Sequence, residues 1–210
     1  MSTPALTLTI VPPEVTSLEQ RALLGGMAFL DLAASDRLQV SDVAAWIEEH
    51  VVKTGCMRRP AVLLEPPVRS VALWPGNPPT ATERADLRRL VEAARYWVIS
   101  ELQAFVGPSS DDRLLRASIF LGRVRREHSQ WVARPQPTDP LSGIAISLFA
   151  AAILSDRSRY EKELCVCDFC GRVAFDARPS MRSSCPLHQP RTISGFVSSV
   201  RSRDLAHGAR

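Results

Sequence analysis

The chain has 210 residues, is 45% hydrophobic and 23% charged, and carries a formal net charge of +4. This length suits one sizeable domain with a small appendage, and the apolar share is ordinary for a soluble globular protein. A membrane span is excluded, because the most apolar stretch, residues 141–154, falls short of the about 20 residues that a bilayer needs. The N-terminus shows no signal-peptide pattern, and cysteines without a disulfide framework are typical of a reducing cytoplasm.

The first part of the chain predicts mixed structure. The expected elements, in order, are a strand within residues 1–15, helices over 17–34 and 41–52, and a hairpin of 61–65 with 68–73. Gly25 and Gly26 weaken the first of these helices. Two helices followed by a hairpin suggest a winged helix, although Trp46 is explained more simply as a core residue.

The middle of the chain predicts a helical hairpin or bundle. A long helix is expected from Thr80 or Thr82 to Val106, where Gly107 ends it. A second helix, starting after Ser110, carries apolar residues at steps of three and four as far as Trp131 and would pack antiparallel to the first. On this seam we interpret His128 as a core or boundary residue. Residues 141–154 are expected as the central buried helix, or as a homo-oligomer interface if they are left uncovered.

The C-terminal part carries the strongest motif, in which two pairs of metal-binding residues each have two residues between their members. Fourteen residues separate the first pair from the second. This spacing lets a chain close a tetrahedral Cys3His shell around one zinc ion, and four protein ligands leave no open position for water, so that the zinc would be structural. The four predicted ligands are Cys167, Cys170, Cys185 and His188.

The expected architecture around this metal is a treble clef. Gly171 directly follows the first pair and supplies a backbone that can fold back with positive φ. Residues 172–176 would form the first strand of a short hairpin. A helix capped by Ser183 or Ser184 would then carry the second pair on one face.

Cys165 leaves the ligand set open. The order Cys-x-Cys-x-x-Cys offers three thiols where two are needed, so Cys165 could replace Cys167. We prefer Cys167, because the two-residue gap followed by glycine makes the better turn. A four-cysteine site without His188 is a further alternative, as are buried thiols or a redox pair without metal.

Positive charge is concentrated at the C-terminal end. Residues 165–210 carry seven arginines and three aspartates, and the rest of the chain is formally neutral. A polyanion would most easily bind there, although a solvated surface is the alternative interpretation. The sequence has no phosphate-binding glycine loop, no His-Glu-x-x-His and no Gly-x-Ser-x-Gly motif, so nothing in it indicates an enzyme.

The run from Cys170 to Asp176, with arginines before Cys185, resembles the C-terminal treble-clef zinc finger of bacterial CGNR-type proteins. Those proteins place the finger after a mostly helical domain and are taken to be DNA-binding transcriptional regulators. The similarity covers about forty residues, and here the last ligand is His188 and the Cys-Gly-Asn-Arg signature is absent. The resemblance implies that phosphate is faced by Arg172, Arg178, Arg182 and Arg191. Arg201 and Arg203 of the basic tail complete the predicted nucleic-acid-binding set.

The sequence thus predicts a mainly α chain in three parts: a segment 1–75 with a small β-hairpin, a helical part 80–160 and a zinc module 165–210. Two functions remain open. The first is a zinc-stabilised regulator of bacterial transcription that binds DNA or RNA through its C-terminal module. The second is a non-enzymatic interaction or scaffold module, in which the zinc is a rigid clip and the apolar helices dock a protein partner.

Overall fold

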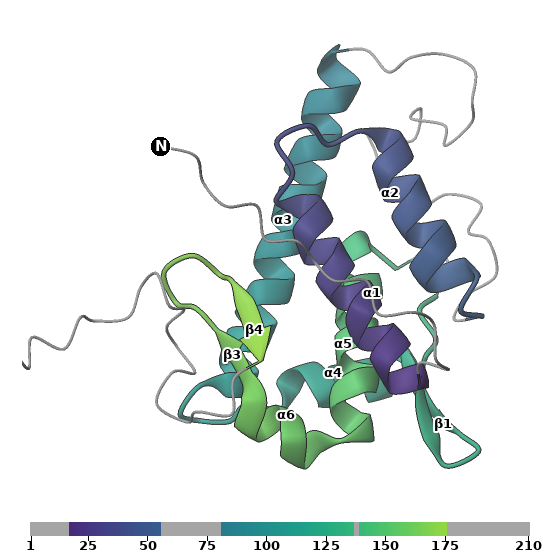
Figure 1. The fold of residues 1–210 in the computed structure, drawn as a ribbon, viewed down its shortest axis with the longest axis vertical. Helices are drawn as coiled ribbons and strands as arrows, with labels where there is room; N and C mark the ends of the chain where they lie inside the picture. Colours follow the sequence, from purple (N-terminus) through teal and green to yellow (C-terminus); the bar gives the residue numbers. More distant parts are fainter. Residues whose placement is uncertain (1–16, 56–80, 137–138, 176–210) are drawn as a thin grey trace, which may run out of the picture.

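The computed structural model describes residues 17–55, 81–136 and 139–175, and the fold is that of these residues (Figure 1). In chain order the elements are α1 (Leu18–Ala33), α2 (Val40–Ile47), the π-helix η1 (Glu48–Val52), α3 (Ala81–Val106), α4 (Arg113–Phe120), β1 (Val124–Glu127), β2 (Gln130–Ala133), α5 (Leu141–Ser155), α6 (Arg157–Glu163), β3 (Leu164–Val166) and β4 (Val173–Phe175). The predicted, mainly helical fold is confirmed. The described strands form two antiparallel hairpins, β1–β2 and β3–β4.

Helix α5 is the centre of the core. It packs against α1, α3, α4 and β2, and it lies behind α1 in the view of Figure 1. Between Leu141 and Ile153 only Ser142 and Ile146 are partly exposed, and this burial around the helix explains why it has no polar face. The expectation of a central buried helix is therefore confirmed. No single helix in the described ranges is long and apolar enough to cross a bilayer; α5 and α6 reach that length only together, across a bend of 108°.

The glycine pair of α1 is where this helix crosses its neighbours most closely. A Cβ on Gly26 would lie 2.7 Å from the ring of Phe149, and one on Gly25 would lie 3.1 Å from Leu148. The carbonyl of Gly25 accepts a 2.9 Å hydrogen bond from Nε1 of Trp46. The glycines that weaken α1 as an isolated helix thus allow it to approach α5, and Trp46 is the core residue that we expected.

The prediction that a long second helix continues to Trp131 is wrong. Helix α4 ends at Phe120, Gly122 adopts a φ of +68°, and the chain turns into the β1–β2 hairpin. His128 and Ser129 form its two-residue loop, with φ values of +46° and +69°, the signs that a type I′ turn requires. His128 is therefore an exposed loop residue and not part of a helical seam.

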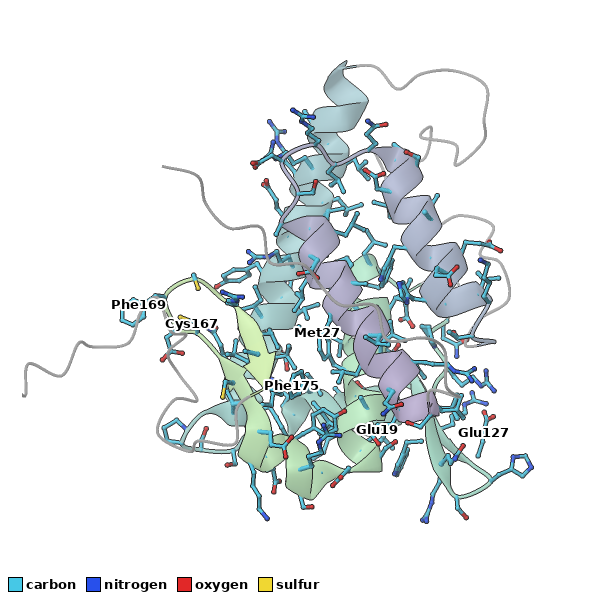
Figure 2. All side chains as sticks on the ribbon, in the orientation of Figure 1. Glu19, Met27, Glu127, Cys167, Phe169 and Phe175 are labelled. Atoms are coloured by element: carbon cyan, nitrogen blue, oxygen red, sulfur yellow. The ribbon has the colours of Figure 1, made fainter. Side chains whose placement is uncertain are left out.

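An ion pair runs along this hairpin, from Arg134 after β2 to Glu127 at the end of β1. Arg134 binds both carboxylate oxygens of Glu127, at 2.8 Å and 2.7 Å, and its guanidinium also donates to the carbonyl of Gly55. The hydrogen bond from Arg134 is the main cause that lowers the pKa of Glu127. These contacts link the hairpin to the end of η1, at the lower right of Figure 2.

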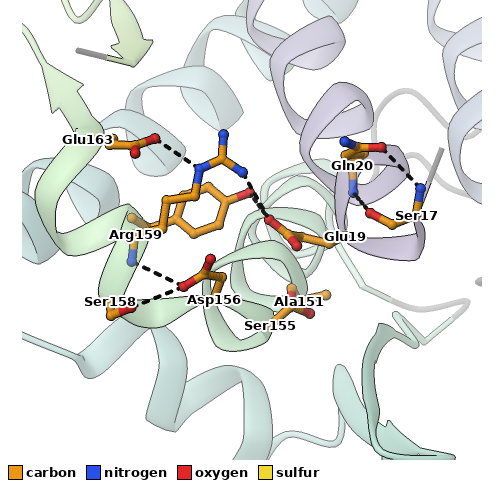
Figure 3. A network of polar contacts seen from close by, with 10 residues as sticks. Ser17, Glu19, Gln20, Ala151, Ser155, Asp156, Ser158, Arg159 and Glu163 are labelled. Atoms are coloured by element: carbon orange, nitrogen blue, oxygen red, sulfur yellow. Dashed lines mark hydrogen bonds and ion pairs between the residues drawn. The ribbon is translucent and has the colours of Figure 1, made fainter. Parts of the chain in front are cut away.

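A polar network ties α6 to α1 (Figure 3). Asp156 caps α6 by accepting a 3.2 Å hydrogen bond from the amide of Arg159. The Tyr160 hydroxyl donates to Glu19 of α1 over 2.9 Å, and Arg159 lies 3.7 Å from the same carboxylate. Burial and the nearby Glu19 carboxylate raise the pKa of the Tyr160 hydroxyl, which therefore stays a donor. The network fixes α6, and α6 leads directly into β3.

Several expected elements lie outside the described residues. These are the strand within 1–15, the hairpin of 61–65 with 68–73 and the helix that would follow Ser183 and Ser184. The winged-helix interpretation of the first part and the second half of the treble clef therefore stay predictions.

Candidate metal centre

The first predicted ligand pair lies in the turn that joins β3 to β4. The strands pair in the register Leu164 with Phe175 and Val166 with Val173. Beyond them the amide of Cys167 donates to the carbonyl of Arg172 over 3.0 Å, and the amide of Gly171 donates back to the carbonyl of Cys167 over 2.8 Å. The two bonds close a tight loop that begins at Cys167 and contains Cys170.

Gly171 gives this loop its shape. Its φ is +66°, in the left-handed region that side chains with a Cβ rarely adopt. It also lies against α3, because a Cβ at this position would be 2.7 Å from Cδ1 of Ile99. The expected fold-back glycine is thus confirmed for the turn. The expected strand 172–176 is present as 173–175, and it pairs with β3, which precedes the ligands.

The loop is held by the helical core on its inner side. Gln103 of α3 donates through Nε2 to the carbonyl of Cys167 over 3.3 Å, and Leu164 and Val166 are fully buried. The ring of Phe175 meets Tyr160 edge to face, with centroids 5.8 Å apart. The cysteine turn is therefore anchored on α3 and α6.

The two cysteines of the pair differ in exposure. Cys167 is 1% exposed, whereas Cys170 lies at the surface. Between them Phe169 is 75% exposed and, in Figure 2, points away from the body of the molecule. A metal held by this pair would therefore sit at the rim of the described part of the fold.

Cys165 lies on β3 itself, opposite Ala174. Its thiol is directed to the carbonyl of Glu163, at 3.5 Å. Within the described ranges no three His, Cys, Asp or Glu side chains come together as a possible metal site. The choice between Cys167 and Cys165 as the partner of Cys170 stays a prediction. Cys185 and His188, which the shell also needs, lie outside the described residues.

The donor chemistry of the turn fits zinc. Two thiols on one tight loop, with a glycine that frees the following amides, is how Cys-x-x-Cys sites present their first pair. Backbone amides near the sulfurs would stabilise the thiolate form that a metal requires. The turn can therefore supply half of a tetrahedral shell.

Only one of the predicted nucleic-acid contacts falls on the described chain. Arg172 is exposed and directly follows Gly171. The remaining predicted contacts lie outside the described residues: Arg178, Arg182, Arg191, Arg201 and Arg203.

Ile99 and Gln103, which contact the cysteine turn, were not predicted from the sequence. They are four residues apart on α3 and lie beside the apolar stripe of that helix. The signal was present, because positions four apart share one helix face. It could not be assigned to the cysteine turn without knowledge of the fold.

Comparison of the chain with protein-family models, curated protein sequences and solved structures gives no match. The interpretation of the cysteine turn as half of a zinc site therefore depends on the residues and geometry of the turn itself.

Proposed function

We propose that this protein is a cytoplasmic, zinc-stabilised nucleic-acid-binding regulator of bacterial transcription. One structural zinc is held by Cys167, Cys170, Cys185 and His188. The observation that carries the proposal is the β3–β4 turn, which offers Cys167 and Cys170 on one glycine-terminated loop. The second pair has the same two-residue spacing and lies within reach of a short connection.

The nucleic-acid part of the proposal is supported by charge. All of the formal net charge falls in residues 165–210, and Arg172 lies exposed beside the cysteine turn. Arg178, Arg182 and Arg191 lie between or next to the predicted zinc ligands in the sequence, so a zinc-bound module would present them together. Such a surface binds phosphates, with an affinity that falls as salt concentration rises. The resemblance to CGNR-type fingers supports the same arrangement.

A specific observation favours the alternative, a protein-interaction or scaffold module. Phe169 projects from the tip of the turn, and large exposed aromatic side chains are enriched where proteins bind each other. In this alternative the zinc remains a structural clip and Phe169 anchors a protein partner.

The first experiment measures zinc content and the ratio of absorbance at 260 and 280 nm for full-length protein purified at moderate salt. Wild type is compared with Cys170→Ser, and Cys165→Ser is the matched control. We expect one zinc per chain and bound nucleic acid in wild type and in the control, with both lost in Cys170→Ser. No zinc in wild type would overturn the metal centre, and loss of zinc in Cys165→Ser would overturn the ligand choice.

A second experiment separates the two functions. Arg191, Arg201 and Arg203 are reversed to glutamate together, and binding to duplex DNA and to RNA is measured over a range of salt concentrations. We expect a large loss of affinity and a shallower salt dependence, because fewer counterions are released. If wild type with a full complement of zinc binds neither nucleic acid, the interaction module becomes the better assignment. A Phe169→Ala variant then tests that module by its loss of partner binding.

A further inference from the structure

A cavity of about 240 Å³ lies where α3, α4 and the start of α5 meet, away from the cysteine turn. Its apolar lining includes Trp97 of α3, Ala117 of α4 and Ile146 of α5. Trp97 is 57% exposed, which leaves its indole at the edge of the cavity. The cavity is open to solvent beside Trp97 and Ala117, which are both exposed, and it has room for a small ligand.

Ser118 is the residue that indicates a ligand. It lines this cavity from α4, it is 1% exposed, and its Oγ has no hydrogen-bond partner among the described residues. A buried hydroxyl without a partner costs free energy, and such groups are few in folded proteins. The Oγ exposes almost no surface as placed, so an acceptor in the cavity would satisfy it after rotation of the side chain about χ1.

The charged lining contributes further donors. Arg113 pairs with Glu101, with Nη2 2.9 Å from Oε1, and Arg123 pairs with Asp139, with Nη2 2.6 Å from Oδ1. Within the described chain these pairs use the Nε and Nη2 edge of each guanidinium, so that each retains Nη1 for another acceptor. Glu101 lines the cavity and Asp139 lies outside the lining, so the lining carries two arginines against one carboxylate and has an excess of donors.

The N-terminal end of α5 adds to this excess. Pro140, Ser142 and Gly143, from the cap and first turn of α5, line the cavity. No described side chain caps this helix. The first amides of a helix lack intrahelical acceptors, and the helix dipole favours negative charge at this end. With the Ser118 hydroxyl beside them, these donors suit one compact anionic group.

We propose that this cavity binds a small aromatic or alicyclic monocarboxylate. The carboxylate accepts from Ser118 Oγ and from the first amides of α5, and the ring packs among Trp97, Ala117 and Ile146. The proposal goes beyond the nucleic-acid function and does not depend on the zinc site. Each proposal can fail without the other.

The test is a titration of the full-length, ¹⁵N-labelled protein with benzoate, followed by two-dimensional ¹H–¹⁵N NMR. We expect saturable shifts at the Trp97 indole and at the amides of Ser118, Ser142 and Gly143, with a dissociation constant of about 1 mM or lower for a ligand of this size. Benzyl alcohol, the neutral analogue, should bind about tenfold more weakly. Shifts elsewhere, no saturation, or equal binding of the alcohol would overturn the proposal.

Variants give the second arm of the test. Ser118→Ala should weaken benzoate binding about tenfold, because it removes one hydrogen bond to a charged group. The matched control is Ser147→Ala in α5, a buried serine whose hydroxyl donates to the carbonyl of Ile144 over 2.7 Å and which does not line the cavity. Ala117→Leu should abolish binding by filling the cavity, with the NMR spectrum showing whether the variant is folded. Unchanged affinity in Ser118→Ala, or in a folded Ala117→Leu protein, would refute the site.

Discussion

Replacing Gly171 by alanine tests how the cysteine turn is docked on the helical core. Two costs add at this position. Alanine at a φ of +66° is strained by about 1 kcal/mol, and its Cβ would lie 2.7 Å from Cδ1 and 3.1 Å from Cγ2 of Ile99. Overpacking of this kind costs about 1–3 kcal/mol, so we expect the free energy of unfolding to fall by about 2–4 kcal/mol. Urea unfolding of the full-length protein, followed by circular dichroism, measures it.

Gly55 provides the matched control. Its φ is +74°, yet a Cβ there would meet nothing within 4 Å, so Gly55→Ala carries the backbone strain alone, about 1 kcal/mol. Adding Ile99→Val to Gly171→Ala deletes Cδ1, the nearest atom, and should recover part of the loss as a measurable coupling between the two sites. If Gly171→Ala and Gly55→Ala destabilise equally and Ile99→Val gives no coupling, the turn is not packed on α3 as described.

Three further substitutions test the core. Gly26→Ala should lower the thermal midpoint despite the better helix propensity of alanine, because its Cβ would lie 2.7 Å from the Phe149 ring; a rise would refute the close crossing. Ser118→Ala should stabilise the protein by about 1 kcal/mol and raise the midpoint by about 2–4 °C, since it removes a buried hydroxyl without a partner; a loss would show that the hydroxyl has one. Burial lowers the pKa of His50, so the unfolded chain binds the proton more readily and stability falls as pH drops below about 6.5; His50→Gln should reduce this fall in urea unfolding at pH 7.5 and 5.5, and an identical fall would refute it.

The helices with one continuous apolar stripe could be predicted from the sequence. In α3 the residues at helical spacing include Leu87, Val91, Val98 and Leu102, and all four are fully buried. Helix α5 could be predicted from its lack of any polar face. In both helices the apolar pattern along the sequence and the burial in the fold favour a helix at the same residues. The sequence is therefore sufficient to predict these two helices.

The β1–β2 hairpin could not be predicted in this way, because apolar spacing continued through it. Leu121, Val124 and Trp131 fit steps of three and four, yet Leu121 is exposed and Val124 is buried as a strand residue. Gly122 was the available sign of a helix end. The loop sequence did not indicate a hairpin, because His128 and Ser129 adopt positive φ values that in two-residue hairpin loops are usually adopted by asparagine and glycine.

The candidate metal site shows a different limit of sequence reasoning. Spacing identified Cys167 and Cys170 as a pair, because ligand geometry is local to the turn. Spacing also suggested a zinc module appended to the helical part, whereas Leu164 and Val166 belong to the same core as α1 and α5. Helix α3 joins the cysteine turn to the cavity. Its residues Ile99 and Gln103 contact the turn, while Trp97 and Glu101 line the cavity. These four residues fall within two turns of one helix, so the two proposed sites share a single structural support that no local motif could reveal.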